Sequence, residues 1–359
     1  MINRAAGEAV GVGTEDEQAW ANTLTWVENG LPAGARVVGA ERLRGGWTSQ
    51  MRRLSVAGDG APGPLVLRSF VKPFFVLHAE GLLTREADVL TLLGDTDVPA
   101  ASLHGVDATA AHCDHPSLLM SLLPGSVRLS DDGAGRRAEL LADQLVRIHR
   151  VRVTAQNRPR SYQAWTAPER VRVPEATERP ELWQRAVDVI RREAPEYRPC
   201  FLHRDFHPGN VLFDEEGDAE GFGREGDAVG GGAEGDAVGG DAVGGAEGHA
   251  LRISGVVDWV ETSWGPADLD VAHCSTALAL LHGAHSGMRF ADAYTAAGGL
   301  LTEEPGDHLY WRMLDALAFA PDAEKVAGPW RELGRDDLTP ELLTRRLEDY
   351  LQELFLRYD

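Results

Sequence analysis

Short apolar runs in the first third of the chain predict the strands of a small sheet. Glycine and proline stand beside most of these runs, as is usual where strands end in turns. The predicted strands cover residues 37–43, 51–56, 64–70 and 117–123, with a further return to the sheet within 98–106. Apolar residues at helical spacing predict one helix around 20–27, ended by Gly30, and another over 84–93.

The rest of the chain mostly carries the periodicity of amphipathic helices. The predicted helices cover residues 136–151, 181–193, 273–281, 310–317 and 342–356. Four prolines between residues 157 and 180 interrupt this pattern and predict an irregular segment. Apolar pairs lead into and out of a tight loop at 203–210, and a last strand covers 253–257. Most predicted sheet elements therefore precede the helices.

Residues 216–249 differ in composition from the rest, being mostly Gly, Ala, Asp, Glu and Val. The run Gly-Asp-Ala-Val-Gly-Gly at 226–231 recurs at 235–240. Such a segment cannot bury enough apolar area to offset its chain entropy, so we predict a disordered insert. Residues 214–249 hold 11 acidic residues and one base, a net −10 of the −21 of the whole chain. A repeat expansion in a tolerated hairpin tip and a partner-binding segment are both open interpretations.

Composition and charge narrow the class of protein. The chain has 359 residues, 43% of them hydrophobic, with 9 Trp and 10 Phe, enough for a sizeable core in two domains or one two-lobed unit. A net charge of −21 argues against binding nucleic acid through its phosphates. The acidity suits a cationic small molecule, or serves solubility alone.

Cysteine usage and the start of the chain predict a cytoplasmic protein. Three widely spaced cysteines, at 113, 200 and 274, do not make a disulfide framework. The first residues lack an apolar signal core, and there is no apolar run of about 18 residues to span a membrane. His112-Cys113-Asp114-His115 has the residue types of a metal site. No second cluster has matching spacing, so we predict a loop or strand edge there.

The loop at 203–210 carries the most specific chemical signal. His203, Arg204 and Asp205 are followed, five residues after the aspartate, by Asn210, with a Pro-Gly turn between them. In kinases this spacing lets the Asp accept the proton of the attacking hydroxyl and the Asn hold Mg²⁺. The strand at 253–257 then ends on Asp258, in the position of a second metal ligand.

These two motifs, residues 202–212 and 255–259, resemble the aminoglycoside phosphotransferase and choline kinase-like family of small-molecule kinases. The resemblance covers roughly residues 35–300. It implies an α+β, protein-kinase-like two-lobed fold, with a small N-lobe of antiparallel sheet plus helix and a larger, mainly helical C-lobe. The predicted parts are a flexible tail 1–13, a nucleotide-binding N-terminal lobe 14–119, a hinge 120–125 and a catalytic and acceptor-binding lobe 126–359.

The resemblance also implies a nucleotide site. Its predicted residues are Gly46, Trp47, Thr48 and Ser49 over the phosphates and Met120, Ser121 and Leu122 at the purine. An ordinary hairpin turn would explain the glycines before Trp47 equally well. The hinge contacts would be made by backbone groups, so ATP and GTP are not distinguished by side-chain identity.

Three charged residues complete the site that the resemblance implies. Arg68 stands where kinases have a strand lysine at the phosphates, with Lys72 as an alternative. Glu86 stands where a helical glutamate pairs with that cation, an exposed helical glutamate being the other interpretation. Asp270 is expected to tie the catalytic loop in place by hydrogen bonds.

Together these features predict an ATP- or GTP-dependent O-phosphotransferase acting on a small molecule. Asp205 would act as base, and Asn210 and Asp258 would hold Mg²⁺. The first predicted acceptor is an aminoglycoside-like antibiotic, which implies antibiotic resistance. The alternatives are choline, homoserine, a macrolide or a sugar, or a catalytically silent nucleotide-binding protein. His207 and Asp258-Trp259 argue against a protein kinase. No nucleic-acid or membrane partner is expected.

Overall fold

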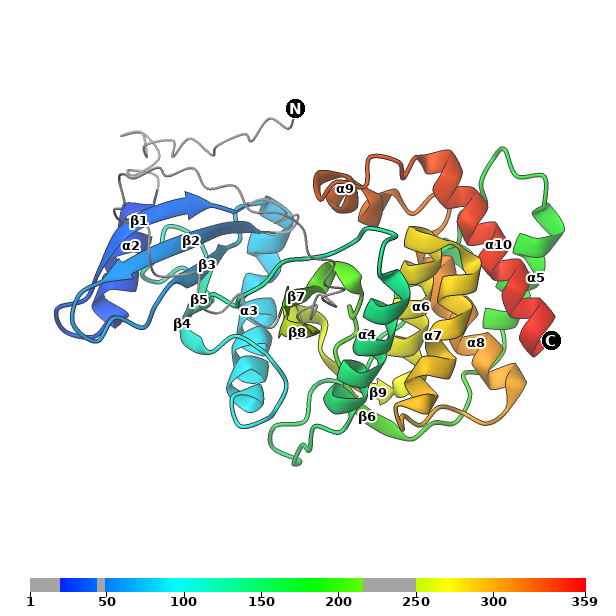
Figure 1. The fold of residues 1–359 in the computed structure, drawn as a ribbon, viewed down its shortest axis with the longest axis horizontal. Coiled ribbons are helices and arrows are strands. Elements are labelled where there is room, and N and C mark those ends of the chain that lie inside the picture. The colour runs from blue at the N-terminus through cyan, green and yellow to red at the C-terminus, as the bar shows by residue number, and fades with distance from the viewer. Residues whose placement is uncertain (1–19, 44–48, 216–249) are drawn as a thin grey trace, which may run out of the picture.

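The computed structural model describes residues 20–43, 49–215 and 250–359, which form two lobes (Figure 1). The smaller lobe is built around a sheet, and the larger one mainly from helices. The predicted two-lobed α+β architecture is confirmed. The predicted tail at 1–13 and the insert at 216–249 lie outside the described residues. No helix in the described ranges has the length and apolar character needed to cross a membrane.

The smaller lobe contains an antiparallel sheet with the strand order β1-β2-β3-β5-β4. Its strands are β1 (Arg36–Arg42), β2 (Gln50–Ala57), β3 (Leu65–Ser69), β4 (Leu103–Asp107) and β5 (Ser117–Ser121). Helix α2 (Ala21–Gly30) packs on one face and α3 (Pro73–Leu93) on the other. Successive side chains of a strand point to opposite faces, so Leu67 packs toward α2 whereas Arg68 meets α3.

Helix α3 begins earlier than its sequence pattern predicts, which corrects the expected range 84–93. It starts at Pro73, a residue favoured in the first turn because its missing N–H is not needed there. Phe74 and Leu77 are 66% and 79% exposed, so the first turns carry apolar residues on the outer face as well as the inward-facing Phe75 and Ala79, which obscures the amphipathic pattern. The longer helix places Glu86 well inside it, on a rigid element.

The segment after β5 joins the two lobes and runs along the hairpin of β7 (Val211–Glu215) and β8 (Leu251–Val256). Ser126 exchanges backbone hydrogen bonds with Phe213, at 3.0 and 2.9 Å. Gly125 has a φ of +89°, and a Cβ there would collide with the Ser254 hydroxyl and the Phe213 carbonyl. Only glycine permits this close approach, which fixes the linker to the hairpin.

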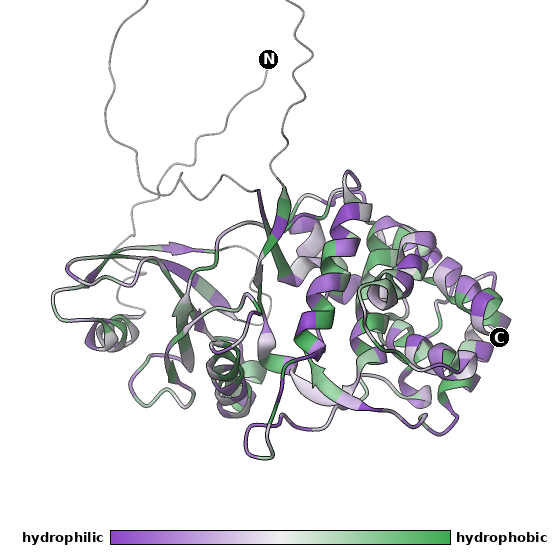
Figure 2. Ribbon diagram, turned by 60° about the horizontal axis from the view of Figure 1, so that its bottom comes forward, coloured by the Kyte–Doolittle hydropathy of each residue, from purple (hydrophilic) through white to green (hydrophobic). Residues whose placement is uncertain are grey.

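Helix α6 (Ala267–His282) lies at the centre of the larger lobe (Figure 1). The helices around it are α4 (Ala134–His149), α5 (Pro180–Ile190), α7 (Ala284–Ala296), α8 (Pro305–Ala316), α9 (Glu324–Glu332) and α10 (Pro340–Tyr358). Figure 2 shows hydrophilic and hydrophobic residues alternating along the outer helices, as amphipathic helices require. Helix α6 is instead buried along nearly its whole length, Asp270 and His273 included. Buried groups of this kind need partners inside the lobe.

The remaining short elements connect these helices. They are strands β6 (Pro199–Leu202) and β9 (Ser263–Pro266), which pair with each other, and the 3₁₀ turns η1 (Pro168–Arg170), η2 (Pro208–Asn210), η4 (Trp259–Glu261) and η5 (Leu317–Phe319). The predicted irregular stretch at 157–180 holds η1 and an isolated bridge from Ser161 to Trp264, and α5 begins at its last residue. Both ends of the predicted catalytic loop are therefore anchored in strands, β6 before it and β7 after it.

Candidate active site

His203 fixes the predicted catalytic loop from within. Its Nε2–H donates to the Val257 carbonyl at 3.0 Å, and its Nδ1 accepts the Asp205 N–H at 3.2 Å. These two partners require a neutral imidazole with its proton on Nε2. Burial lowers the pKa of His203 and favours the same form. The loop is thereby tied to the strand end that precedes Asp258.

Asp270 fixes the backbone of the same loop from helix α6. Its carboxylate accepts the N–H groups of His203 and Arg204, each at 2.8 Å. Arg204 has a φ of +74°, which is uncommon for a residue with a Cβ, and these bonds help to hold it. His149 supports Asp270 at 3.2 Å and also bonds to the Tyr294 hydroxyl at 2.6 Å. The tying contacts expected of Asp270 are present.

Asn210 links Asp205 to the strand that ends at Asp258. Its Nδ2 donates to the backbone carbonyl and to Oδ2 of Asp205, at 2.9 and 3.0 Å. On its other side β7 and β8 pair in antiparallel register, and the Val257 N–H donates to the Asn210 carbonyl at 3.0 Å. The residue after Val257 is Asp258, so the hairpin brings it next to Asn210 although a long insert separates them in sequence.

The Asn210 amide and the Asp258 carboxylate fit a magnesium ion. Both offer oxygen ligands of the kind that Mg²⁺ takes in proteins. Because Nδ2 of Asn210 is held by Asp205, the amide oxygen points the other way, and no donor to it occurs among the described residues. Asp258 precedes η4 with a φ of +66°, an unusual backbone that a functional site can sustain.

Arg68 reaches the same place from the smaller lobe. Its Nη1 lies 2.8 and 2.7 Å from the two carboxylate oxygens of Glu86, and its Nη2 lies 3.0 Å from Oδ1 of Asp258. Burial alone would lower the pKa of Arg68, but the carboxylates of Asp258 and Glu86 outweigh it and raise that pKa. The buried Nε has no hydrogen-bond partner within the described parts of the chain. Lys72 instead stands at the exposed start of α3.

A chain of hydrogen bonds from helices α8 and α6 also reaches the Asp205 carboxylate. Nε2 of His273 lies 3.0 Å from Oδ1 of Asp205, and Nδ1 of His273 lies 3.0 Å from Oδ1 of Asp315 in α8. His273 and Asp315 are only 2% and 4% exposed. His273, Asp315 and His149 were not singled out as site residues from the sequence, since none of them stands in the loop motif and their contacts span distant helices.

The protonation states of His273, Asp205 and His207 follow from their burial and from the charged groups that they contact. Burial alone would lower the pKa of His273, but the Asp315 and Asp205 carboxylates raise it to about 9, so the imidazole is protonated at neutral pH. Burial alone would raise the pKa of Asp205, but the hydrogen bond from His273 holds it below its usual value. His207 is neutral, because burial lowers its pKa to about 4.

The comparison with protein families decides the class of protein. A model of the phosphotransferase enzyme family matches residues 39–222, just over half of the chain. The chain belongs to this family. The expected family and the expected enzyme class, a phosphotransferase of the small-molecule kinase type, are confirmed. Curated protein sequences gave no match.

Solved structures of similar fold support the same architecture. A candidate aminoglycoside phosphotransferase from Ralstonia eutropha is 16% identical, with a TM-score of 0.56 over 94% of this chain and 98% of its own. A variant of aminoglycoside phosphotransferase APH(4)-Ia, with AMP-PNP and hygromycin B, is 14% identical, with a TM-score of 0.54 over 92% and 97%. APH(3'')-Id from Streptomyces rimosus is 16% identical, with a TM-score of 0.51 over 82% and 96%. This phosphotransferase therefore has the protein-kinase-like fold.

The other predicted nucleotide contacts of this phosphotransferase are described only in part. Gly46, Trp47 and Thr48 lie outside the described residues, and Ser49 is buried immediately before β2. At the end of β5 the N–H groups of Ser121 and Leu122 donate to Ser102 and Pro64, at 2.9 and 3.0 Å. These two N–H groups are thus not free for a purine. Met120 is paired with Val66 of β3 and with Leu103 of β4, and the predicted hinge contact of Met120, Ser121 and Leu122 stays a prediction.

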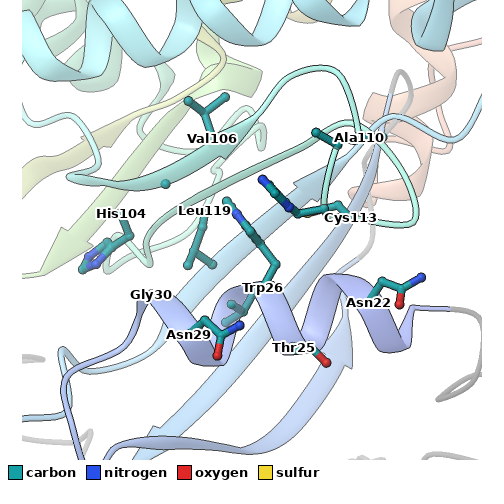
Figure 3. Close-up of a pocket in the computed structure, with 14 residues that line it drawn as sticks. Asn22, Thr25, Trp26, Asn29, Gly30, His104, Val106, Ala110, Cys113 and Leu119 are labelled. Atoms are coloured by element: carbon teal, nitrogen blue, oxygen red, sulfur yellow. The ribbon is translucent and has the colours of Figure 1, made fainter.

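A cavity of about 910 Å³ lies in the smaller lobe, between α2 and strands β4 and β5 (Figure 3). Trp26 points from α2 toward this sheet edge, and a Cβ on Gly105 would lie 3.1 Å from its ring. His112 and Cys113 line the same cavity from the loop between β4 and β5, in agreement with the loop or strand edge expected for that cluster. Among the residues that the structure describes, none of those predicted to bind nucleotide or to act in catalysis lines it.

Proposed function

We propose that this protein transfers the γ-phosphoryl group of ATP or GTP to a hydroxyl group of a small molecule. The observation that carries the proposal is the contact of Asn210 with Asp205 on one side and with the strand end before Asp258 on the other. Arg68 reaches Asp258 from the smaller lobe. Phosphoryl transfer needs this set: a group for the acceptor proton, oxygen ligands for a metal and a cation for the phosphates.

Each residue has a separate role in the proposal. Asp205 accepts a hydrogen bond from the acceptor hydroxyl and takes its proton as the transfer proceeds. Arg68, oriented by Glu86, holds the nucleotide phosphates, and its unpartnered Nε is a donor that a phosphate oxygen could use. Asn210 and Asp258 would hold Mg²⁺, which neutralises charge on the phosphates when bound. Rate enhancement then comes from positioning and from charge.

The first acceptor that we propose is an aminoglycoside-like antibiotic, with resistance to it as the biological role. A solved structure of the same fold holds AMP-PNP together with hygromycin B. The net charge of −21 suits a cationic acceptor. For the location of the protein we keep the cytoplasm as a proposal.

The side chains near Asp205 favour a second candidate, a less cationic metabolite alcohol such as a sugar, homoserine or choline. The Lys325 ammonium lies 5.1 Å from the Phe319 ring centre. A lysine within electrostatic reach of Asp205 repels a polycation, whereas a neutral sugar or an alcohol with a single positive charge meets less repulsion there.

The test is nucleoside-diphosphate release, measured with ATP and with GTP across a panel of aminoglycosides, a macrolide, choline, homoserine and sugars. We expect release that depends on the acceptor for at least one alcohol, with the phosphorylated product detected by mass spectrometry. Nucleotide binding without acceptor-dependent release anywhere in the panel would favour the silent nucleotide-binding alternative.

Deleting residues 217–248 should leave the enzyme folded and active. Glu215 of β7 pairs directly with Leu251 of β8, so the strand ends lie side by side and the three remaining residues can close the hairpin. We expect turnover within about threefold of the full chain, as for tolerated changes at loop tips. The measurement is acceptor-dependent turnover with circular dichroism as the folding control. A folded deletion protein without turnover would mean that the insert acts in the reaction.

A further inference from the structure

The imidazole of His273 is held rigidly on all sides. Both of its ring nitrogens are hydrogen-bonded, to Asp205 and to Asp315. Trp165 meets the ring edge-on at 5.0 Å between centroids, and Phe319 stacks against it at 5.4 Å. A side chain restrained in this way has one orientation, and it passes that orientation on to the carboxylate that it touches.

Asp205 is consequently held at both carboxylate oxygens. Its Oδ1 is bonded to His273 and its Oδ2 to Asn210, each at 3.0 Å. Asn210 fixes one edge of the carboxylate from the loop itself, whereas His273 fixes the other edge from α6. The two bonds together define the plane of the carboxylate, which one bond alone would leave free to turn.

A metal ion is the alternative explanation for the cluster of Asp205, His207 and His273, whose ligand atoms lie within 4.8 Å of one another. The hydrogen bonds argue against it. Nδ1 of His207 accepts the Gly209 N–H at 3.0 Å, so the neutral ring carries its proton on Nε2, the nitrogen that faces Asp205. His273 has no ring nitrogen left over. The cluster is therefore a hydrogen-bond network.

We propose that His273 and Asp315 are positioning residues for the phosphoryl transfer: Asp315 orients a protonated His273, which in turn fixes and pairs with the carboxylate of Asp205. The inference rests on the proposed function of Asp205 as base. In this proposal His273 contacts neither the acceptor nor the nucleotide, and it transfers no proton. Its positive charge also offsets part of the negative charge that gathers where a triphosphate must bind.

The charged and titratable groups that face His273 favour its protonated form. Asp205 and His207 face it from the loop, Asp315 from α8, and Lys325 of α9 lies within electrostatic reach of both carboxylates. Two carboxylates in direct contact outweigh one more distant ammonium. The neutral His207 adds no charge.

The first test needs no substrate. Nitrogen-15 NMR of the histidine rings in the full chain should show both His273 nitrogens protonated at neutral pH, with titration near the expected pKa of about 9. The His273→Gln variant assigns the signal. A neutral His273 ring at pH 7 would overturn the proposal, whatever the activity of the enzyme.

The second test separates positioning from binding. We expect His273→Ala to lower kcat by about 100-fold, as for a misplaced reacting group, with the nucleotide KM changed less than threefold. His273→Gln, whose amide can still donate to Asp205, should recover part of this loss. His308→Ala, which removes a half-buried imidazole from α8, is the matched control and should keep wild-type kcat. Equal kcat in folded His273→Ala and wild type contradicts the proposal.

A third readout does not depend on turnover. The folded-state pKa of His273 is raised from 6.5 to about 9, so its protonated form adds stability that is fully present below pH 6.5. That contribution is lost as the pH rises through about 9. We expect the free energy of urea unfolding to fall over this window in the wild type and to fall less in His273→Gln. Identical pH profiles in both proteins would contradict a protonated His273.

The tests distinguish this inference from the proposed function. If Asp205→Asn keeps full turnover, the assignment of Asp205 as base fails, and the positioning role fails with it. If Asp205→Asn loses turnover while folded His273→Ala keeps wild-type kcat, only the inference about His273 and Asp315 is overturned.

Discussion

Replacing Asp205 by asparagine is expected to lower kcat by about 10²- to 10⁴-fold, the range for removal of a general base. The amide is nearly isosteric, and its single oxygen can still accept one of the two hydrogen bonds that Asp205 receives from His273 and Asn210. The loop should keep its shape, because Asp270 and His203 hold its backbone. Nucleotide affinity should stay within a few-fold of the wild type, since the proposed phosphate contacts come from Arg68 and the metal ligands. Acceptor-dependent turnover and nucleotide titration measure the two effects separately.

Asp292→Asn is the matched control for this substitution. Asp292 is paired with Arg357 on the surface of α7, away from the proposed active site, so its loss should leave kcat unchanged. Unchanged turnover in Asp205→Asn would refute the proposed base. Loss of nucleotide binding together with turnover would show instead that the substitution disturbs the whole site.

Replacing Arg68 by methionine is expected to destabilise the fold and to abolish nucleotide binding. Glu86 is 1% exposed, and without Arg68 it would be a buried carboxylate with no opposite charge. Breaking a buried ion pair from one side costs about 3–5 kcal/mol, a large part of the stability of an ordinary domain. Urea unfolding measures this loss, and nucleotide titration measures the binding.

A double variant separates the two effects of Arg68. Arg68→Met with Glu86→Leu replaces both buried charges by apolar groups, which is often nearly neutral for stability. We therefore expect stability to return while nucleotide binding does not. If the double variant binds nucleotide as tightly as the wild type, Arg68 is not a phosphate ligand. If Arg68→Met alone is as stable as the wild type, the ion pair does not support the fold.

The geometry also shows how Arg68 differs from a lysine in its place. A planar guanidinium can bond to Glu86 through one nitrogen and to Asp258 through the other, so it joins a helix of one lobe to a loop of the other. A lysine ammonium is a point charge and would not hold both with the same geometry. We therefore expect Arg68→Lys to bind nucleotide more weakly than the wild type and more tightly than Arg68→Met.

Local patterns were sufficient for the fold class and for proposing the three central residues. Asp205 and Asn210 stand in one loop at a fixed spacing, and Asp258 ends an apolar strand, so the proposed chemistry follows from contiguous stretches of sequence. The helix over 73–93 was predicted only from residue 84, because its first turns carry apolar side chains on the exposed face as well as on the buried one. Periodicity detects a helix only where apolar residues keep to one face.

The sequence by itself determined the family, the two-lobed architecture and the loop that carries the proposed chemistry, because each depends on neighbours along the chain. Only the tertiary structure decided which cation pairs with Glu86. It also decided that Asp315 and His273 form a hydrogen-bond chain to Asp205. Those contacts join residues separated by 18, 42 and 68 positions. Partners this far apart leave no spacing to recognise, and their strength comes from burial, which exists only once the chain has folded.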